Sequence, residues 1–202
     1  MQTITIINGS QRPKSQSAKV ADFIRMLLER RGGVKLNALS LSDTPLRLWS
    51  DDPDALLEQA PGWAPIAEML RASQALIFVV PEWNGMAAPA IKNFFLYCTR
   101  HELADRPALI VAVSSGNGGS LPASELRTSS FKDTQVCYIP EQVIVRRVMT
   151  VLNNAEQPES EEDAYIRYRL DYALGVLLEY GNALTLVRQS GVRNFEIVRY
   201  GM

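Results

Sequence analysis

The segment TITIINGSQRPKSQS, residues 3–17, decides the prediction of the fold because it joins a β-rich run to a polar turn. Residues 3–8 form a short, nearly continuous apolar run, which is typical of a strand covered on both faces. The residues that follow contain no large apolar side chain, but they carry a glycine, several hydroxyls and two cations. They form either a solvated turn or a cradle for an anion, and the rest of the chain has to distinguish the two.

Strand and helix patterns alternate along the rest of the chain. Further strands are predicted at residues 34–39, 75–80, 108–115 and 135–140. Helices are predicted at residues 17–33, 63–73, 88–98 and, as a long C-terminal helix and tail, from about residue 160 to 202. Ser160 and Asp163 resemble a capping box at the start of that last helix. About five alternations imply right-handed βαβ units, and hence an α/β fold with a parallel sheet and helices on both faces.

Composition limits the class of protein. Of the 202 residues, 47% are hydrophobic and 21% are charged, and the formal net charge is −1. These values suit one domain over residues 1–202 and argue against nucleic acid as a partner. We see no signal peptide and no apolar run long enough for a bilayer, so no membrane partner is expected. Cys98 and Cys137 lie far apart without metal-ligand spacing, which indicates a cytoplasmic protein with no metal site.

The first loop, GSQRPKSQS, has the chemistry of a site for one phosphate. Gly9 permits a sharp turn, and Arg12 can neutralise negative charge. Hydroxyl donors come from Ser10, Ser15 and Ser17, and the next helix offers free N–H groups. The pattern is neither GxGxxG nor GxxxxGKS/T, so it does not indicate a pyrophosphate site or a P-loop. Taken alone, a polar turn with a serine N-cap explains this loop equally well.

Two more loops follow strong predicted strands and precede helices. PEWNG, residues 81–85, offers backbone groups and the flat side chain of Trp83 to a planar ligand, although an ordinary turn with a core or interface tryptophan is the simpler alternative. SSGNGG, residues 114–119, has glycines that allow close approach to a ligand or merely provide flexibility. Ligands of open parallel sheets bind beyond the carboxyl ends of the strands. Three such loops at one edge therefore indicate a shared site.

Together the three loops resemble the NADPH-dependent FMN reductase family. GSQRPKSQS is similar to that family's G-S-x-R-x-x-S phosphate loop, and PEWNG followed by PAIKNFF is similar to its P-E-Y-N-x-x-x-P-x-x-L-K-N segment. SSGNGG resembles its third, glycine-rich flavin loop, and the match in order and spacing covers about residues 1–130. Trp83 replaces the usual tyrosine, Ser17 stands where asparagine is frequent, and Ala88 stands where other small residues are common. The C-terminal region carries no such match.

The resemblance implies a flavodoxin-like three-layer sandwich around a five-stranded parallel sheet, with FMN as cofactor. It implies that the FMN phosphate is held by Ser10, Arg12, Ser15, Gln16 and Ser17. The isoalloxazine ring would lie along Pro81, Glu82, Trp83, Asn84 and Gly85. The third loop would contact the flavin through Ser115, Gly116 and Gly119.

The activity that the resemblance implies is transfer of hydride from NAD(P)H through bound FMN to a small-molecule acceptor such as a quinone, an azo compound or free flavin. This chemistry takes place on the flavin and requires no catalytic side chain. The chain fits this requirement, because it has one histidine, His101, and no G-x-S-x-G nucleophile motif. The resemblance also implies a homodimer or homotetramer in which a neighbouring chain helps to cover the flavin.

Two other functions remain open for the same fold. A non-enzymatic FMN module for electron transfer or sensing, of flavodoxin type, is the main alternative. Flavodoxins usually have a T-x-T-G-type loop and strong negative charge, and this chain has neither. An interaction protein that has lost its flavin is the other alternative, and the hydroxyls of the first loop and Arg12 argue against it.

Overall fold

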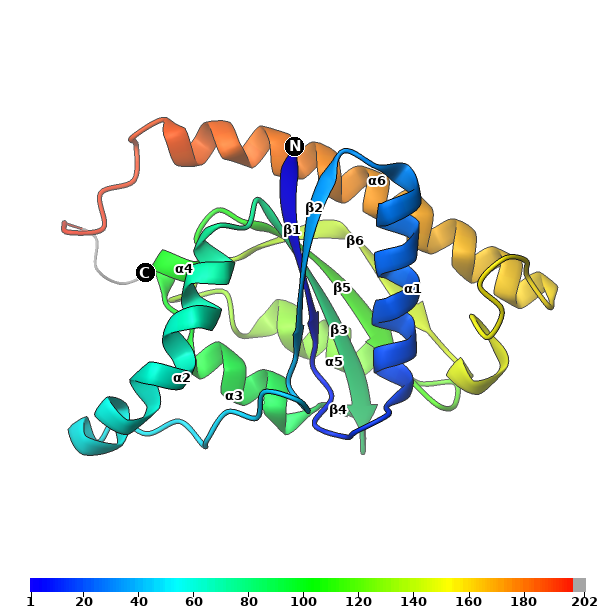
Figure 1. The fold of residues 1–202 in the computed structure, drawn as a ribbon, viewed down its shortest axis with the longest axis horizontal. Coiled ribbons are helices and arrows are strands. Elements are labelled where there is room, and N and C mark those ends of the chain that lie inside the picture. The colour runs from blue at the N-terminus through cyan, green and yellow to red at the C-terminus, as the bar shows by residue number, and fades with distance from the viewer. Residues whose placement is uncertain (198–202) are drawn as a thin grey trace.

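The computed structural model describes residues 1–197, so residues 198–202 of the predicted domain lie outside the described residues. The strands are β1 (Gln2–Asn8), β2 (Val34–Ser40), β3 (Ala75–Trp83), β4 (Met86–Ala87), β5 (Pro107–Val113) and β6 (Cys137–Val145). The helices are α1 (Gln16–Arg31), α2 (Pro53–Arg71), α3 (Pro89–Tyr97), α4 (Arg100–Leu103), α5 (Ser120–Thr128) and α6 (Glu161–Gln189), with a short 3₁₀ helix η1 (Val148–Thr150). Figure 1 shows the sheet at the centre of the molecule.

The sheet has the strand order β2-β1-β3-β5-β6, and every pair along this path is parallel. The five-stranded parallel sheet predicted from the sequence is therefore confirmed. A two-residue strand, β4, adds an antiparallel pair to the end of β3. The chain runs outward from β1 to β2 and then crosses back to β3, so the strand order reverses between β1 and β3. This reversal is where open α/β sheets bind ligands.

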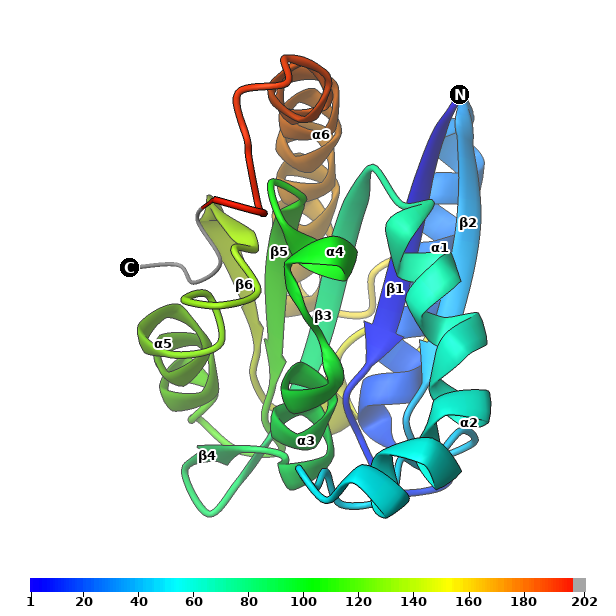
Figure 2. The same cartoon turned by 90° about the vertical axis from the view of Figure 1, so that its left-hand side faces the viewer.

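Both faces of the sheet are buried because single strands supply side chains to two cores. Along β3, Ile77 and Val79 pack into the core beneath α1 and α6, while Leu76 and Phe78 pack into the core beneath α2, α3 and α5. Figure 2 shows α1 and α6 behind the sheet and the other helices in front of it. The continuous apolar runs read from the sequence follow from this three-layer arrangement.

Some boundaries differ from the predicted ones. The strand β6 begins at Cys137 and runs to Val145, beyond the predicted end at residue 140. Since β6 is the edge strand of the described sheet, Pro140 is tolerated at an irregularity in its register with β5. The helix α2 starts well before the predicted residue 63, with Asp52 as its N-cap, and continues through Pro61 and Pro65. The helix expected after the third loop is α5, whereas the short helix α4 has no counterpart among the predicted ones.

The long C-terminal helix is confirmed as α6, but its N-terminus differs from the prediction. Ser160 is the N-cap, and its hydroxyl accepts a hydrogen bond from Asp163 N at 3.1 Å. The expected capping box is wrong in its other half, because the Asp163 carboxylate does not return to Ser160. It accepts from Leu152 N at 2.8 Å and Glu159 N at 3.0 Å, and it pairs with Arg167 at 3.1 Å. Asp163 thus ties α6 to the segment before it.

Burial of Asp163 opposes its ionisation, but the hydrogen bonds from Arg167, Leu152 N and Glu159 N outweigh burial and hold the pKa of this carboxyl below its usual value of 3.8. The sign of the effect on stability follows. A depressed pKa in the folded state contributes stability above pH 3.8, and this stability is lost as the pH falls through the lower folded value.

We predict that Asp163→Asn lowers the free energy of unfolding by about 3 kcal/mol at neutral pH, because it leaves Arg167 without its carboxylate in a nearly buried position. Chemical denaturation at neutral and acid pH measures the free energy of unfolding. The difference in this free energy between the variant and the wild type should be smaller at acid pH. The control is Asp22→Asn, which breaks an exposed ion pair with Arg25 and should cost less than about 0.5 kcal/mol. Equal effects of the two variants would contradict the prediction.

Among the described residues, no helix is both long and apolar enough to cross a membrane.

Candidate functional site

The three loops singled out in the sequence meet in one cleft of about 300 Å³ at the carboxyl ends of β1, β3 and β5. The cleft is lined by Ser10, Arg12, Ser15, Gln16, Ser17, Pro81, Glu82, Trp83, Asn84, Val113, Ser115 and Val148. The structure therefore brings together all the predicted site residues except Gly85, Gly116 and Gly119, which belong to the same loops but do not line the cleft. The first and second loops contribute most of its wall.

The first loop presents donors that the protein itself does not use. Ser15 is the N-cap of α1, and its hydroxyl accepts from Ala18 N at 3.1 Å. The N–H groups of Gln16 and Ser17 make no hydrogen bond within residues 1–197, because the first turn of a helix has no internal acceptors for them. The hydroxyl-bearing Ser10 and Ser17 are both buried against the cleft. This combination is suited to an anion.

Arg12 brings positive charge to the same end of the cleft. Its guanidinium forms no ion pair with any carboxylate of the described chain. Instead it lies over the Trp83 ring, 5.3 Å from the ring centroid, in a cation–π contact. Trp83 is 40% exposed, so it forms part of the rim of the cleft and not of the core. The core alternative considered for Trp83 is therefore wrong.

The second loop is a strand end and a tight hairpin. Pro81 pairs with Val113 in the parallel ladder, and Trp83 faces Met86 across the antiparallel pair with β4. Asn84 and Gly85 form the two-residue turn between them, with φ values of 48° and 74°. Two positive φ values in succession are typical of a type I′ turn, which asparagine followed by glycine favours. Residues 81–83 therefore belong to strand ladders, and only the turn residues Asn84 and Gly85 lie outside them.

The third loop is attached to the second through Glu82. The Oε2 atom of Glu82 accepts hydrogen bonds from Ser114 Oγ and from Gly119 N, both at 2.9 Å. A Cβ atom added to Gly118 would stand 2.0 Å from this oxygen, and one added to Gly119 would stand 2.6 Å from Ile144. The loop can pass so close to the carboxylate only because these positions carry no side chain.

Three positions of the site were missed from the sequence. Val113 and Val148 line the cleft, and Gly118 makes room for Glu82. Val113 is the last residue of β5 and could have been found from its place at the strand end. Val148 lies in η1, far along the chain, and no local signal marks it. Gly118 was quoted as part of SSGNGG, but its neighbour across the loop is a tertiary contact.

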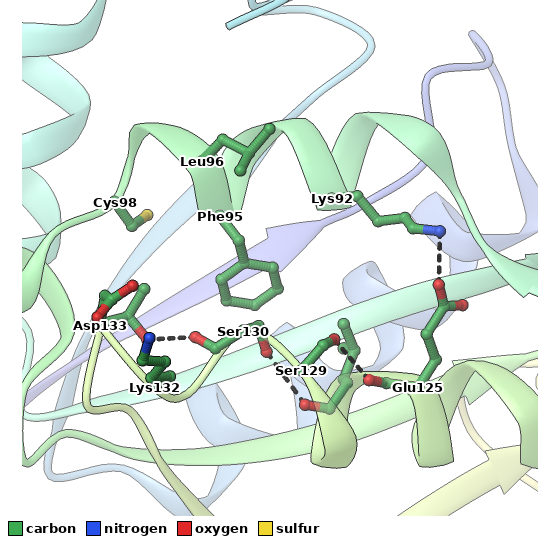
Figure 3. A pocket seen from close by; sticks show the side chains of 11 residues that line it. Lys92, Phe95, Leu96, Cys98, Glu125, Ser129, Ser130, Lys132 and Asp133 are labelled. Carbon is green, nitrogen blue, oxygen red and sulfur yellow. Dashed lines mark hydrogen bonds and ion pairs between the residues drawn. The ribbon is translucent and has the colours of Figure 1, made fainter. Parts of the chain in front are cut away.

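A larger cavity, of about 510 Å³, lies between α3 and the segment that follows α5 (Figure 3). None of the predicted site residues lines it. The charges at one end are paired as Lys92 with Glu125 at 2.5 Å, and the hydroxyls of Ser129 and Ser130 donate to backbone carbonyls. Burial raises the pKa of the Cys98 thiol, so it is no nucleophile. Lys132 and Asp133 also line this cavity, which lies apart from the three predicted loops.

The remaining reactive residues lie outside the cleft. His101 is exposed on α4 and contacts Phe195, with the ring centroids 6.2 Å apart. Within residues 1–197, no group of three or more histidine, cysteine, aspartate or glutamate side chains is placed to hold a metal ion. Both cysteines are free.

With the geometry known, comparison with other proteins gives the family. The model of the family described as NADPH-dependent FMN reductase matches residues 2–150. This chain belongs to the NADPH-dependent FMN reductase family. The resemblance of the three loops to that family is thereby confirmed, and so is the predicted function, an FMN-dependent oxidoreductase that uses NAD(P)H. The match ends shortly before α6, which agrees with the absence of a resemblance in the C-terminal region.

Related sequences of this FMN reductase include quinone reductases. One from Pseudomonas putida is 28% identical over 150 residues, covering 70% of this chain and 77% of its own. Another from Escherichia coli is 28% identical over 198 residues, covering 93% of this chain and 97% of its own. Among solved structures, a flavoenzyme NAD(P)H:(acceptor) oxidoreductase from Paracoccus denitrificans superposes with a TM-score of 0.69 at 21% identity, covering 91% of this chain and 98% of the other. That structure supports the fold alone.

We predict that Gly118→Ala destabilises the FMN-free protein by about 1–3 kcal/mol, because the new methyl group has to displace the Glu82 carboxylate or the loop. Gly116→Ala is the matched control in the same loop. A Cβ at Gly116 meets nothing within 4 Å, so its effect should stay within about 0.5 kcal/mol. Thermal unfolding of both variants measures the difference, and similar melting temperatures would contradict it.

Proposed function

We propose that this FMN reductase is an NAD(P)H:quinone reductase that holds FMN in the cleft at the carboxyl ends of β1, β3 and β5. The observation that carries the proposal is the convergence of the three loops on one cleft whose donors are unused by the protein. Quinone is the acceptor that we favour, because the curated relatives from Pseudomonas putida and Escherichia coli are named quinone reductases. Azo compounds and free flavin are further acceptors of the same planar kind.

The first loop would hold the phosphate of FMN. The N–H groups of Gln16 and Ser17 stand at the positive end of the α1 dipole, with the Ser10, Ser15 and Ser17 hydroxyls beside them. Arg12 would supply the countercharge, because no carboxylate of the described chain competes for its guanidinium. The donor set therefore fits a monophosphate group.

The second and third loops would hold the ring system. Pro81, Trp83 and Asn84 of the second loop and Ser115 of the third loop line the same cleft as the first loop. Gly85, Gly116 and Gly119 would act through the shape of the backbone, since none of them lines the cleft. The N–H groups of Gly116 and Gly119 already donate to Ser114 Oγ and to Glu82.

Bound FMN would supply the redox chemistry, namely the transfer of hydride from NAD(P)H to the acceptor. The chain's own residues would bind the flavin and orient it. Val113 and Val148 provide apolar surface, and Trp83 offers a flat, partly exposed face at the rim where a planar acceptor can stack. No side chain of the cleft needs to move a proton, and we assign Glu82 no acid–base role.

We also propose that the chain forms a homodimer or homotetramer in the cytoplasm. Exposed apolar side chains lie close to the cleft on β4 and α5, namely Met86 at 47% and Leu121 at 56% exposure. A second copy covering them would also shield the ring face beside Trp83. Both cysteines are free, which is consistent with a reducing compartment. The described residues 1–197 would form a single domain.

The experiment that tests the function is spectroscopic. We expect the purified protein to be yellow or to take up FMN at micromolar concentration, to bleach with NADPH or NADH under argon, and to regain colour when a quinone is added. A protein that does not take up FMN contradicts the proposal. A yellow protein that neither reduced nucleotide bleaches would instead be an electron-transfer module of flavodoxin type.

We predict that Arg12→Ala weakens FMN binding by about 1–3 kcal/mol, the size of a charge-assisted hydrogen bond. Quenching of flavin fluorescence gives the dissociation constant. The control is Lys14→Asn, which removes a second cation from the same loop but outside the cleft. Asparagine suits the positive φ of 52° at this position, so the loop should keep its shape. Equal losses in both variants would remove Arg12 from the site.

A further inference from the structure

The carbonyl groups of the third loop, residues 114–119, are held by the segment that follows β6. Ser114 O accepts from Val148 N at 3.2 Å, and Gly116 O accepts from Arg147 N at 2.9 Å. Both bonds join backbone to backbone, so they depend on the course of the chain and not on side-chain rotamers. They orient the carbonyl groups of Ser114 and Gly116 toward residues 146–148.

Arg146 binds two further carbonyl groups of the loop. Its Nε atom donates to Asn117 O at 2.8 Å and to Gly118 O at 3.0 Å. The peptide unit between Gly118 and Gly119 is therefore held at both ends, because Gly119 N donates to Glu82 Oε2 at 2.9 Å. The carbonyl of this peptide accepts a hydrogen bond from an arginine, and its N–H donates one to a carboxylate. A flip of the peptide plane would therefore break two charged hydrogen bonds.

This arrangement determines where the free N–H groups of the loop point. In a trans peptide the N–H is directed opposite to the carbonyl. The carbonyls of Ser114, Gly116 and Asn117 all face residues 146–148, so the N–H groups of the residues after them face the other way. Those N–H groups belong to Ser115, Asn117 and Gly118, and none of them has an acceptor in the part of the chain that the structure describes.

Arg147 connects the loop to the C-terminal helix. Its Nη1 atom donates to Asn117 Oδ1 at 2.9 Å, and its Nη2 and Nε atoms bind Glu162 in the first turn of α6 at 2.5 Å and 3.2 Å. The residue itself has a φ of 42°, a conformation that a non-glycine residue keeps only where its surroundings hold it. Glu162 lies beyond the region that matches the family model.

We propose that Glu82, Arg146 and Arg147 form a clamp that sets the backbone of the third loop so that its unbonded N–H groups face the polar edge of the flavin. The proposal rests on the function proposed above. The three residues are positioning residues, because they act through the loop. The benefit is preorganisation: donors fixed in advance cost no reordering when negative charge develops on the bound ring. Through Glu162, α6 supports the same site from outside the cleft.

The central test is Arg146→Ala, since Arg146 is exposed and its loss should not unfold the protein. In the FMN-free protein, we expect hydrogen exchange of the hydrogen-bonded amides of the loop, those of Ser114, Gly116 and Gly119, to become about tenfold faster, the effect of losing one charged hydrogen bond. In the loaded protein, we expect FMN to bind about tenfold more weakly and its midpoint potential to become more negative, because fewer oriented donors stabilise the reduced ring.

Two further variants and one control sharpen the test. Arg146→Lys keeps a charged donor within reach of both carbonyls and should restore part of the potential. Glu162→Gln should shift the potential in the same direction as Arg146→Ala but less, because Arg147 keeps its bond to Asn117. The control is Arg169→Ala, which breaks a bridge from α6 to Glu141 of β6 at 2.6 Å without contacting the loop. It should change neither the exchange of residues 114–119 nor the potential.

The outcomes separate the clamp from the proposed function. Unchanged exchange in Arg146→Ala would overturn the clamp, whether or not the protein binds FMN. Faster exchange with unchanged FMN affinity and potential would overturn the part of the inference that directs the loop at the flavin. If the wild-type protein took up no FMN, the proposed function would fail, while faster exchange would still support the clamp as a feature of the loop.

Discussion

Parallel hydrogen bonding among β1, β3 and β5 is the constraint on which the rest of the molecule depends. The register pairs Asn8 with Val79 and Pro81 with Val113, so the three strands end at the same edge of the sheet. Because both faces are packed, a slip of one residue would exchange the side chains of the two cores. The core therefore enforces the register, and the register brings the three loops together.

The cleft differs from the rest of the chain in how its polar groups are used. Elsewhere, buried charges have partners, as in Asp163 with Arg167 and Glu102 with Arg71. Within the described residues 1–197, Arg12 at the cleft has an aromatic ring beside it and no carboxylate, and the N–H groups of Gln16 and Ser17 at the start of α1 have no acceptor. Donors left free at one place are typical of a binding site, since a folded chain otherwise satisfies them. Glu82 shows the opposite behaviour within the same cleft, because its Oε2 atom is fully engaged by the third loop.

The sequence predicted the fold and most of the site because both depend on local patterns. Continuous apolar strands, the helix predicted at residues 17–33 and the three polar loops are all visible in short stretches of sequence. For residues 81–85 the sequence left a ligand-binding loop and an ordinary turn open, and the structure shows a turn at Asn84 and Gly85, a pair that favours it. The error at Asp163 has a different origin. The sequence carries both the spacing of a capping box, from Ser160 to Asp163, and that of an ion pair along the helix, from Asp163 to Arg167. Only the packing of α6 onto the preceding segment decides which partners the Asp163 carboxylate takes.

The amino-acid sequence by itself determined the three-layer architecture, the family and the identity of the loops that form the cleft. The sequence determined them because hydrophobic periodicity and short loop motifs depend only on residues that are close together in the chain. Only the tertiary structure decided that Val148 closes the cleft, that Gly118 makes room for a carboxylate and that Arg146 and Arg147 hold the glycine-rich loop. These contacts join residues far apart in the chain, and their existence depends on the strand order and on the path of the backbone after β6.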